Sequence, residues 1–113
     1  MTIQAGQLKK RVAIDQPINT QNETGEEITD WELVGTFWAR IHPLDGREAL
    51  QANVNISEMD TRITLRWSSV LDVMTTGWRI RFKDTIYDLK SVLTLELERR
   101  EIEVMAKSGV NLG

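Results

Sequence analysis

The sequence contains no cysteine and only one histidine, and these absences remove several classes of function. Without cysteine there is no disulfide framework, no thiolate metal site and no thiol nucleophile. The single histidine, His42, cannot form a multi-histidine metal site, and catalysis would require partners that the sequence does not indicate. We therefore expect no metal, no cofactor and no catalytic residue, and we expect His42 to be structural or to lie on the surface.

Long apolar runs and phosphate-binding motifs are also missing. No apolar run approaches the roughly 18 residues that span a bilayer. Residues 1–10 lack the apolar core of a signal peptide, so nothing marks the chain for export or for a membrane. The seven glycines match neither the P-loop nor the dinucleotide fingerprint. A formal net charge of −3 does not supply the dense basic surface that non-specific binding to nucleic acid needs.

Period-two alternation of apolar and polar residues dominates what is present, and it predicts β-strands. Gly35 lies inside the clearest of these stretches and predicts a bulge or a bend there. In the last stretch Leu95 and Leu97 are odd-numbered whereas Ile102 and Val104 are even-numbered, so a turn or bulge is expected at Glu98–Glu101. The predicted strands are Leu8–Asp15, Trp31–Ile41, Thr61–Trp67, Trp78–Lys83, Ile86–Leu93 and the two parts of Leu95–Lys107.

Turn-forming residues separate these stretches. Pro17 is expected to end the first strand, because proline cannot donate to a ladder. Residues 18–30 read as a solvated loop or a long hairpin tip, residues 47–52 as one helical turn, and residues 108–113 as a short tail. The chain is predicted to be all-β: one domain over residues 1–113, a small antiparallel barrel or sandwich of about six to seven strands. Long loops at about 18–30 and 43–60 and at most one short helix complete it.

Basic residues that alternate with apolar ones give the one indication of nucleic-acid binding. With Trp67 and Trp78 they would line a groove for a single strand. We favour the other interpretation, that they form the solvated face of amphipathic strands and pair with acidic residues across the sheet. The candidate DNA-facing residues are Arg62, Arg66, Arg79, Arg81 and Lys83.

Four tryptophans in 113 residues is a high content, and tryptophan both fills cores and anchors interfaces. Trp38 lies on the mixed face of its predicted strand, which makes it an interface candidate. Trp31 and Trp67 are expected in the core.

Several segments, in this order, resemble the bacteriophage head–tail joining proteins, also called head-closure, stopper or head–tail adaptor proteins. The resemblance covers about residues 6–107. It begins with Gly6-Gln7-Leu8, Lys10-Arg11 and Val12-Ala13-Ile14, and continues with Gly25-Glu26 before Trp31. The most specific part is Phe37-Trp38-Ala39-Arg40-Ile41 followed by Pro43-Leu44 and Gly46-Arg47-Glu48. Weaker parts are Thr64-Leu65-Arg66-Trp67, Ile80 with Tyr87, and Arg99-Arg100-Glu101; Gly77-Trp78-Arg79-Ile80 departs from the plainer polar turn of the family.

The resemblance implies a small β-barrel that works as a structural protein of the virion neck, not as an enzyme. It implies a ring of 6 or 12 copies, with the portal or adaptor protein above it and the tail terminator or tail tube protein below it. Such a ring closes the DNA-filled head, offers a platform to the tail, lets packaged DNA pass through its channel and is assembled in the cytoplasm of the host bacterium. A loop within Pro43–Asp60 would project into the channel.

The interface and loop candidates that follow are Trp38, Arg40, Asp45, Arg47, Glu48, Glu26 and Glu27. The alternatives left open are another neck or tail-completion component and a small nucleic-acid-binding β-barrel. The phage can also be a prophage remnant.

Overall fold

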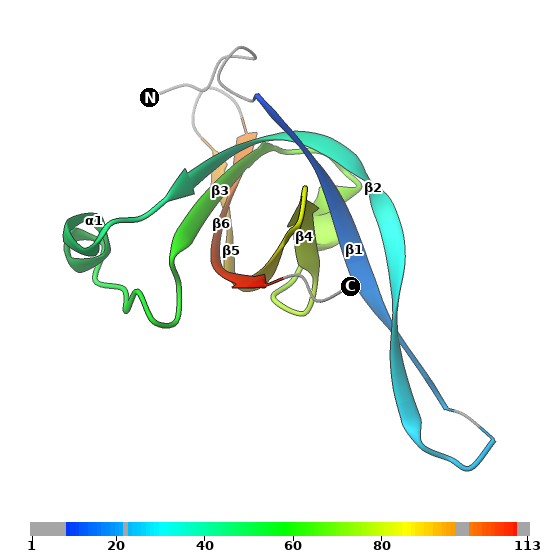
Figure 1. Cartoon of the computed structure of the whole chain (residues 1–113). Helices are drawn as coiled ribbons and strands as arrows, with labels where there is room; N and C mark the ends of the chain where they lie inside the picture. Colours follow the sequence, from blue (N-terminus) through cyan, green and yellow to red (C-terminus); the bar gives the residue numbers. More distant parts are fainter. Residues whose placement is uncertain (1–8, 22, 97–99, 111–113) are drawn as a thin grey trace.

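The computed structural model describes residues 9–21, 23–96 and 100–110, and it is built almost wholly from strands. Six strands and one short α-helix follow one another along the chain (Figure 1), with a three-residue 3₁₀ turn at Leu71–Val73. The elements are β1 (Lys10–Gln21), β2 (Glu27–Pro43), α1 (Gly46–Gln51), β3 (Thr61–Arg66), β4 (Arg79–Phe82), β5 (Thr85–Glu96) and β6 (Arg100–Val110).

The strands close into one antiparallel barrel in the order β1-β2-β3-β6-β5-β4. The predicted all-β fold, a barrel or sandwich of about six to seven strands with at most one short helix, is therefore confirmed as a barrel. Alternate side chains point inward and bury the branched aliphatic residues that the alternation placed on one face. The most buried of these, at most 2% exposed, are Val12, Ile14, Ile63, Leu65, Ile80, Leu89, Ile102 and Val104, and Leu71 of the 3₁₀ turn joins them in the core.

A β-bulge in β2 changes which face of the strand its residues occupy. Ile14 pairs with Gly35 but Asp15 pairs with Leu33, so Val34 is the extra residue. A side chain on Gly35 would meet the ring of Phe37, with its Cβ 3.2 Å from the ring carbons. The bulge predicted near Gly35 is confirmed, and it places Leu33 on the outer face although Phe37 faces the core.

β1 and β2 continue past the barrel as a two-stranded ribbon, which Figure 1 shows extending away from the other strands. β4 pairs with β1 only as far as Asp15, and β3 pairs with β2 only from Ala39 to Pro43. We call residues 16–32 the arm, with residue 22 outside the described part of the chain. Figure 1 places the arm tip and α1 at opposite ends of the molecule, whose longest extent is 51 Å.

Several predicted boundaries are wrong. Pro17 does not end the first strand. β1 continues through Pro17 to Gln21 as one strand of the two-stranded ribbon. Residues 18–30 are mainly strand, with residues 23–26 between β1 and β2. The prediction of a solvated loop is therefore wrong here, and the alternative prediction of a long hairpin tip is the one that agrees with the structure. β6 runs to Val110, so part of the predicted tail 108–113 is strand, and residues 111–113 lie outside the described chain.

At the predicted turn Glu98–Glu101, β5 ends at Glu96 and β6 begins at Arg100, while residues 97–99 lie outside the described chain. The helical turn predicted at Arg47–Ala52 is present as α1, one residue earlier.

Candidate interaction surfaces

A buried carboxylate organises the outer face where the arm leaves the barrel. Asp15 is 2% exposed, and its Oδ2 accepts from Arg79 Nε at 2.8 Å and from Arg81 Nε at 2.6 Å. Arg81 also donates from Nη2 to Asp15 Oδ1 at 3.1 Å. Burial alone would raise the pKa of Asp15, but the hydrogen bonds and charges of Arg81 and Arg79 outweigh it and lower this pKa. The same contact raises the pKa of Arg81.

Next to this cluster, Trp31 lies at the root of the arm. It is 39% exposed, and the guanidinium of Arg79 stacks over its ring at 4.3 Å. The expectation that Trp31 belongs to the core is wrong, because the bulge at Val34 turns this part of β2 to the outer face. Leu33 beside it is 56% exposed. Arg79 thus joins the buried carboxylate to an exposed apolar surface.

A second outer surface lies at the barrel end of the same two strands. Trp38 is 52% exposed, and Arg11, its partner across the β1–β2 ladder, stacks over its ring at 5.3 Å and donates to Thr36 Oγ1 at 3.1 Å. Arg40 is two residues along β2, and the register puts Arg66 of β3 on the other side of Trp38. We call Arg11, Trp38, Arg40 and Arg66 the arginine patch; no carboxylate of the described chain forms an ion pair with its three arginines.

The loop between β2 and β3 contains α1, and hydrogen bonds fix the start of this helix. Asp45 caps α1 by accepting from the Glu48 backbone N–H at 2.7 Å, and the Glu48 side chain reaches back to the Asp45 N–H, which is a capping box. His42 donates from Nε2 to Glu48 Oε2 at 2.5 Å. This bond, with the Asp45 backbone N–H, lowers the pKa of Glu48. Arg47, on the same helix, is exposed.

The base of the loop is fastened to the barrel by Asp60. Its carboxylate accepts from the Ser108 backbone N–H at 2.9 Å, from the Ser108 hydroxyl at 2.7 Å and from the Thr61 hydroxyl at 2.9 Å. Burial opposes ionisation of Asp60, but these hydrogen bonds lower its pKa overall. Burial and the nearby Asp60 charge raise the pKa of Tyr87. The loop from residue 44 to residue 60 therefore has a fixed base and an exposed head.

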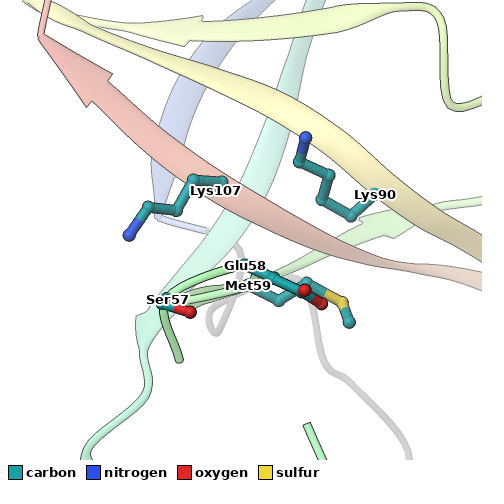
Figure 2. Close-up of a pocket in the computed structure, with 5 residues that line it drawn as sticks. All are labelled: Ser57, Glu58, Met59, Lys90 and Lys107. Carbon is teal, nitrogen blue, oxygen red and sulfur yellow. The ribbon is translucent and has the colours of Figure 1, made fainter. Parts of the chain in front are cut away.

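A shallow recess lies between this loop and β5–β6 (Figure 2). Ser57, Glu58 and Met59 form one side, and Lys90 and Lys107 form the other. Figure 2 shows the two lysine side chains directed to different places, so their charges do not converge on one bound group. In the described part of the chain no group of three His, Asp or Glu residues could hold a metal ion. No helix described here is long and apolar enough to cross a membrane.

The candidate DNA-facing residues do not form one surface. Arg79 and Arg81 point to Asp15, and Arg62 lies 3.7 Å from Glu103 across the β3–β6 ladder. Arg66 is exposed beside Trp38, and Lys83 is exposed in the β4–β5 turn, where its φ is 53°. The aromatic residues suggested with them are not available either: Trp78 is 8% exposed in the core, and Trp67 packs against the core and donates to Asp72.

The interface candidates fall into three groups. Trp38 and Arg40 lie in the arginine patch, and Asp45, Arg47 and Glu48 lie at the head of the loop. Glu26 is exposed in the turn of the arm, and Glu27 begins β2, although its side chain is outside the described part. Sequence reasoning missed Asp15 and Asp60. Asp15 falls on the polar face of the alternation in β1, so nothing in the sequence marks it as buried.

Comparison with known proteins adds the family. The model of the phage head completion protein family matches residues 3–109. The chain belongs to this family. Head completion proteins are structural components of the virion, so this head completion protein is expected at the virion with other virion components. No curated protein matches its sequence at a significant level.

Two solved structures share the fold of this head completion protein. The solution structure of protein SF1141 from Shigella flexneri 2a superposes with a TM-score of 0.74 at 22% sequence identity, covering 95% of this chain and 97% of that one. A chain in the virion of a native gene transfer agent particle superposes with a TM-score of 0.65 at 17% identity, covering 91% and 96%. At these identities the likeness concerns the barrel fold.

Proposed function

We propose that this head completion protein forms a ring in the virion neck, between the portal or adaptor and the tail, where it closes the filled head and receives the tail. The observation that carries the proposal is the family match over residues 3–109, on a closed barrel with two projecting elements. A closed barrel has little free sheet edge with which to pair a neighbouring protein, so we expect the elements that project from the barrel to make those contacts. The arm and the α1 loop are those projections, and they lie at opposite ends of the molecule (Figure 1).

The α1 loop is our candidate for the element that faces the channel. Its base is fixed at Asp60, and α1 presents Arg47 and the 80% exposed Leu50. Residues 43–60 contain one arginine and the acidic residues Asp45, Glu48, Glu58 and Asp60, a formal charge of −3. A ring of such loops would repel the phosphate backbone, so this loop would retain DNA by narrowing the channel rather than by binding it.

The role we propose is assembly, and the perturbed ionisable groups of the described chain are accounted for by contacts that fix its elements. The ionisable groups with lowered pKa values, Asp15, Glu48 and Asp60, are each satisfied by neighbours within the fold. Their contacts fix the arm, the helix and the loop base. Perturbed ionisable groups also occur in structural networks, and the geometry here fits that case.

The test is deletion of the gene in its phage, followed by electron microscopy and measurement of head DNA. We expect separate tails and heads that have lost their packaged DNA, with normal virions restored by the wild-type gene supplied in trans. Tailless heads that keep their DNA would instead identify a component acting after head closure, such as a tail-completion protein. Normal virions without the gene would refute the proposal.

A further inference from the structure

The arm is the most acidic part of the chain. Between Arg11 and Arg40 the sequence contains no lysine or arginine. The arm has a formal charge of −5 and the whole chain −3, so the rest of the chain carries +2. Glu23, Glu26 and Asp30 are exposed. The acidic residues of the arm are Glu23, Glu26, Glu27, Asp30 and Glu32.

The arm is also poorly supported by its own chain. A two-stranded hairpin alone is marginally stable in water. The ladder from Gln16 to Gln21 carries the arm about 20 Å beyond the barrel. At its root Trp31 and Leu33 remain 39% and 56% exposed, although Arg79 stacks over the indole of Trp31. Such a projection gains from burial against another protein.

The arginine patch has the complementary character. Trp38 stands half exposed among Arg11, Arg40 and Arg66, and none of these arginines forms an ion pair within the described chain. Tryptophan and arginine are the residues most enriched in interface hot spots. Arg66 faces Glu101 across the β3–β6 ladder, and an acidic partner would bring further carboxylates to the three guanidinium groups.

The arm cannot reach the patch of its own chain. The arm and Trp38 of the patch are both on the β1–β2 hairpin, and the eight residue steps from Asp30 to Trp38 separate them by about 26 Å along β2. Figure 1 shows the arm extending away from the barrel, whereas the patch lies where β2 pairs with β3 in the barrel wall. Contact between them therefore requires a second copy, and it joins two different surfaces, which is the kind of contact that closes a ring.

We propose that the arm of one copy docks on the arginine patch of the next copy around the ring. In this contact acidic side chains of the arm lie beside Arg11, Arg40 and Arg66, and Trp38 becomes buried at the centre. The inference rests on the proposed ring, and it names the two surfaces that build it.

Because the chain has no cysteine, disulfide trapping tests the contact directly. One protein carries Thr24→Cys in the arm turn, and a second carries Thr36→Cys, two residues from Trp38 on the outer face. At millimolar concentration under oxidation, we expect the mixture to give at least a tenfold higher yield of mixed dimer than Thr24→Cys with Thr94→Cys, an exposed site on β5. Equal yields for the two pairs, or no Thr24–Thr36 product, would overturn the proposal.

Charge reversal gives an independent test with the same readout. Glu26→Lys with Asp30→Lys should abolish the cross-link to a wild-type patch, as should Arg40→Glu with Arg66→Glu against a wild-type arm. Combining the reversed arm with the reversed patch should restore it. Asp84→Lys with Lys90→Glu, exposed sites away from both surfaces, should leave the yield unchanged. Failure of the combined variants to restore the cross-link would count against charge pairing.

Two further outcomes separate this inference from its rivals. If the patch instead binds nucleic acid, Arg40→Glu with Arg66→Glu will abolish a salt-dependent mobility shift of DNA and leave the cross-link yield intact. If deletion of the gene releases DNA from heads but the Thr24–Thr36 cross-link never forms, the proposed function stands and this contact is wrong. Normal virions without the gene would refute the proposed function, whatever the cross-link shows.

Discussion

Asp15 shows how one residue can link the core to the surface. It follows the fully buried Ile14 on β1 and points to the outer face, yet it is only 2% exposed because Arg79 and Arg81 cover it. An uncompensated charge at such a site would be strongly unfavourable, and here two guanidinium groups compensate it. One side chain thereby ties β1 to β4 and orients Arg79 over Trp31.

Replacing Asp15 by asparagine should lower the free energy of unfolding at pH 7 by roughly 2–3 kcal/mol, because two partly buried arginines lose their counter-charge. The folded pKa of Asp15 is lowered, so its contribution is fully present above the unfolded value of 3.8 and is lost as pH falls through the folded value. Urea unfolding should therefore show the difference between variant and wild type shrinking below about pH 4.

The exposed Asp84→Asn provides the control, with no more than about 0.5 kcal/mol of change at either pH. An Asp15→Asn deficit of the same size at pH 3 and pH 7 would contradict the assignment.

Single residues on the outer face were only partly predictable. The exposure of Trp38 follows from its place on the mixed face of the strand. The exposure of Trp31 does not follow from the alternation. The bulged residue Val34 lies between Trp31 and Trp38 and shifts the pattern by one residue, and alternation predicts which face a side chain occupies only within an unbroken ladder. The partners of Asp15 are 64 and 66 residues away along the chain, a separation over which no local pattern acts.

At the scale of elements, α1 is a short helix held by its first turn. With six residues it has little stability of its own. Its order comes from the capping box of Asp45 and Glu48, from His42, and from Ala49, which is 3% exposed. The helix can therefore be loosened without unfolding the barrel.

We expect Asp45→Ala to cost about 1 kcal/mol locally, because the Glu48 N–H loses its acceptor. Amide hydrogen exchange at Ala49 and Ala52 should quicken about fivefold, which is that energy expressed as a rate ratio. Exchange of core amides in β3 and β6 should not change.

The neighbouring Arg47→Ala, also exposed on α1, should leave all these rates as they are. Faster exchange throughout the barrel in Asp45→Ala would show that the cap supports more than the helix.

Elements were predicted better than their ends. The strand in each alternating stretch was found because inward and outward positions differ in polarity. The arm was missed as strand because its residues are polar on both faces: no core selects an inward face outside the barrel, so alternation has no cause there. Proline is tolerated at position 17 of β1 because the β1–β4 ladder ends at Asp15, so no hydrogen bond on that side of the strand needs the N–H that proline lacks.

At the scale of the whole molecule, the distribution of charge disfavours binding to DNA by the free protein. The net charge is −3, and Arg79 and Arg81 are committed to Asp15. We expect a Kd for duplex DNA weaker than about 10⁻⁴ M at 0.15 M salt, measured by fluorescence anisotropy. The variant Glu23→Lys with Glu26→Lys and Asp30→Lys, six charges more positive, should bind measurably.

Tight, salt-sensitive binding by the wild-type protein that Arg66→Glu removes would favour the nucleic-acid alternative.

The overall architecture was predictable because it depends on a count of strands and turns. The proposed contact between the arm and the arginine patch was not predictable, since these two surfaces adjoin neither in the sequence nor within one molecule.

The barrel closes along its shortest described ladder. Three residue pairs join β1 to β4, centred on Ile14 and Ile80, and Asp15 fastens one end of them. Contacts between segments so far apart in the chain form late in folding. Before this seam closes, the six strands would form an open sheet with a bare apolar side. Asp15→Asn should accordingly speed unfolding and leave the refolding rate nearly unchanged in stopped-flow measurements. During that interval two copies can exchange β1 across their open seams, so slow closure would favour strand-swapped dimers over the correct monomer.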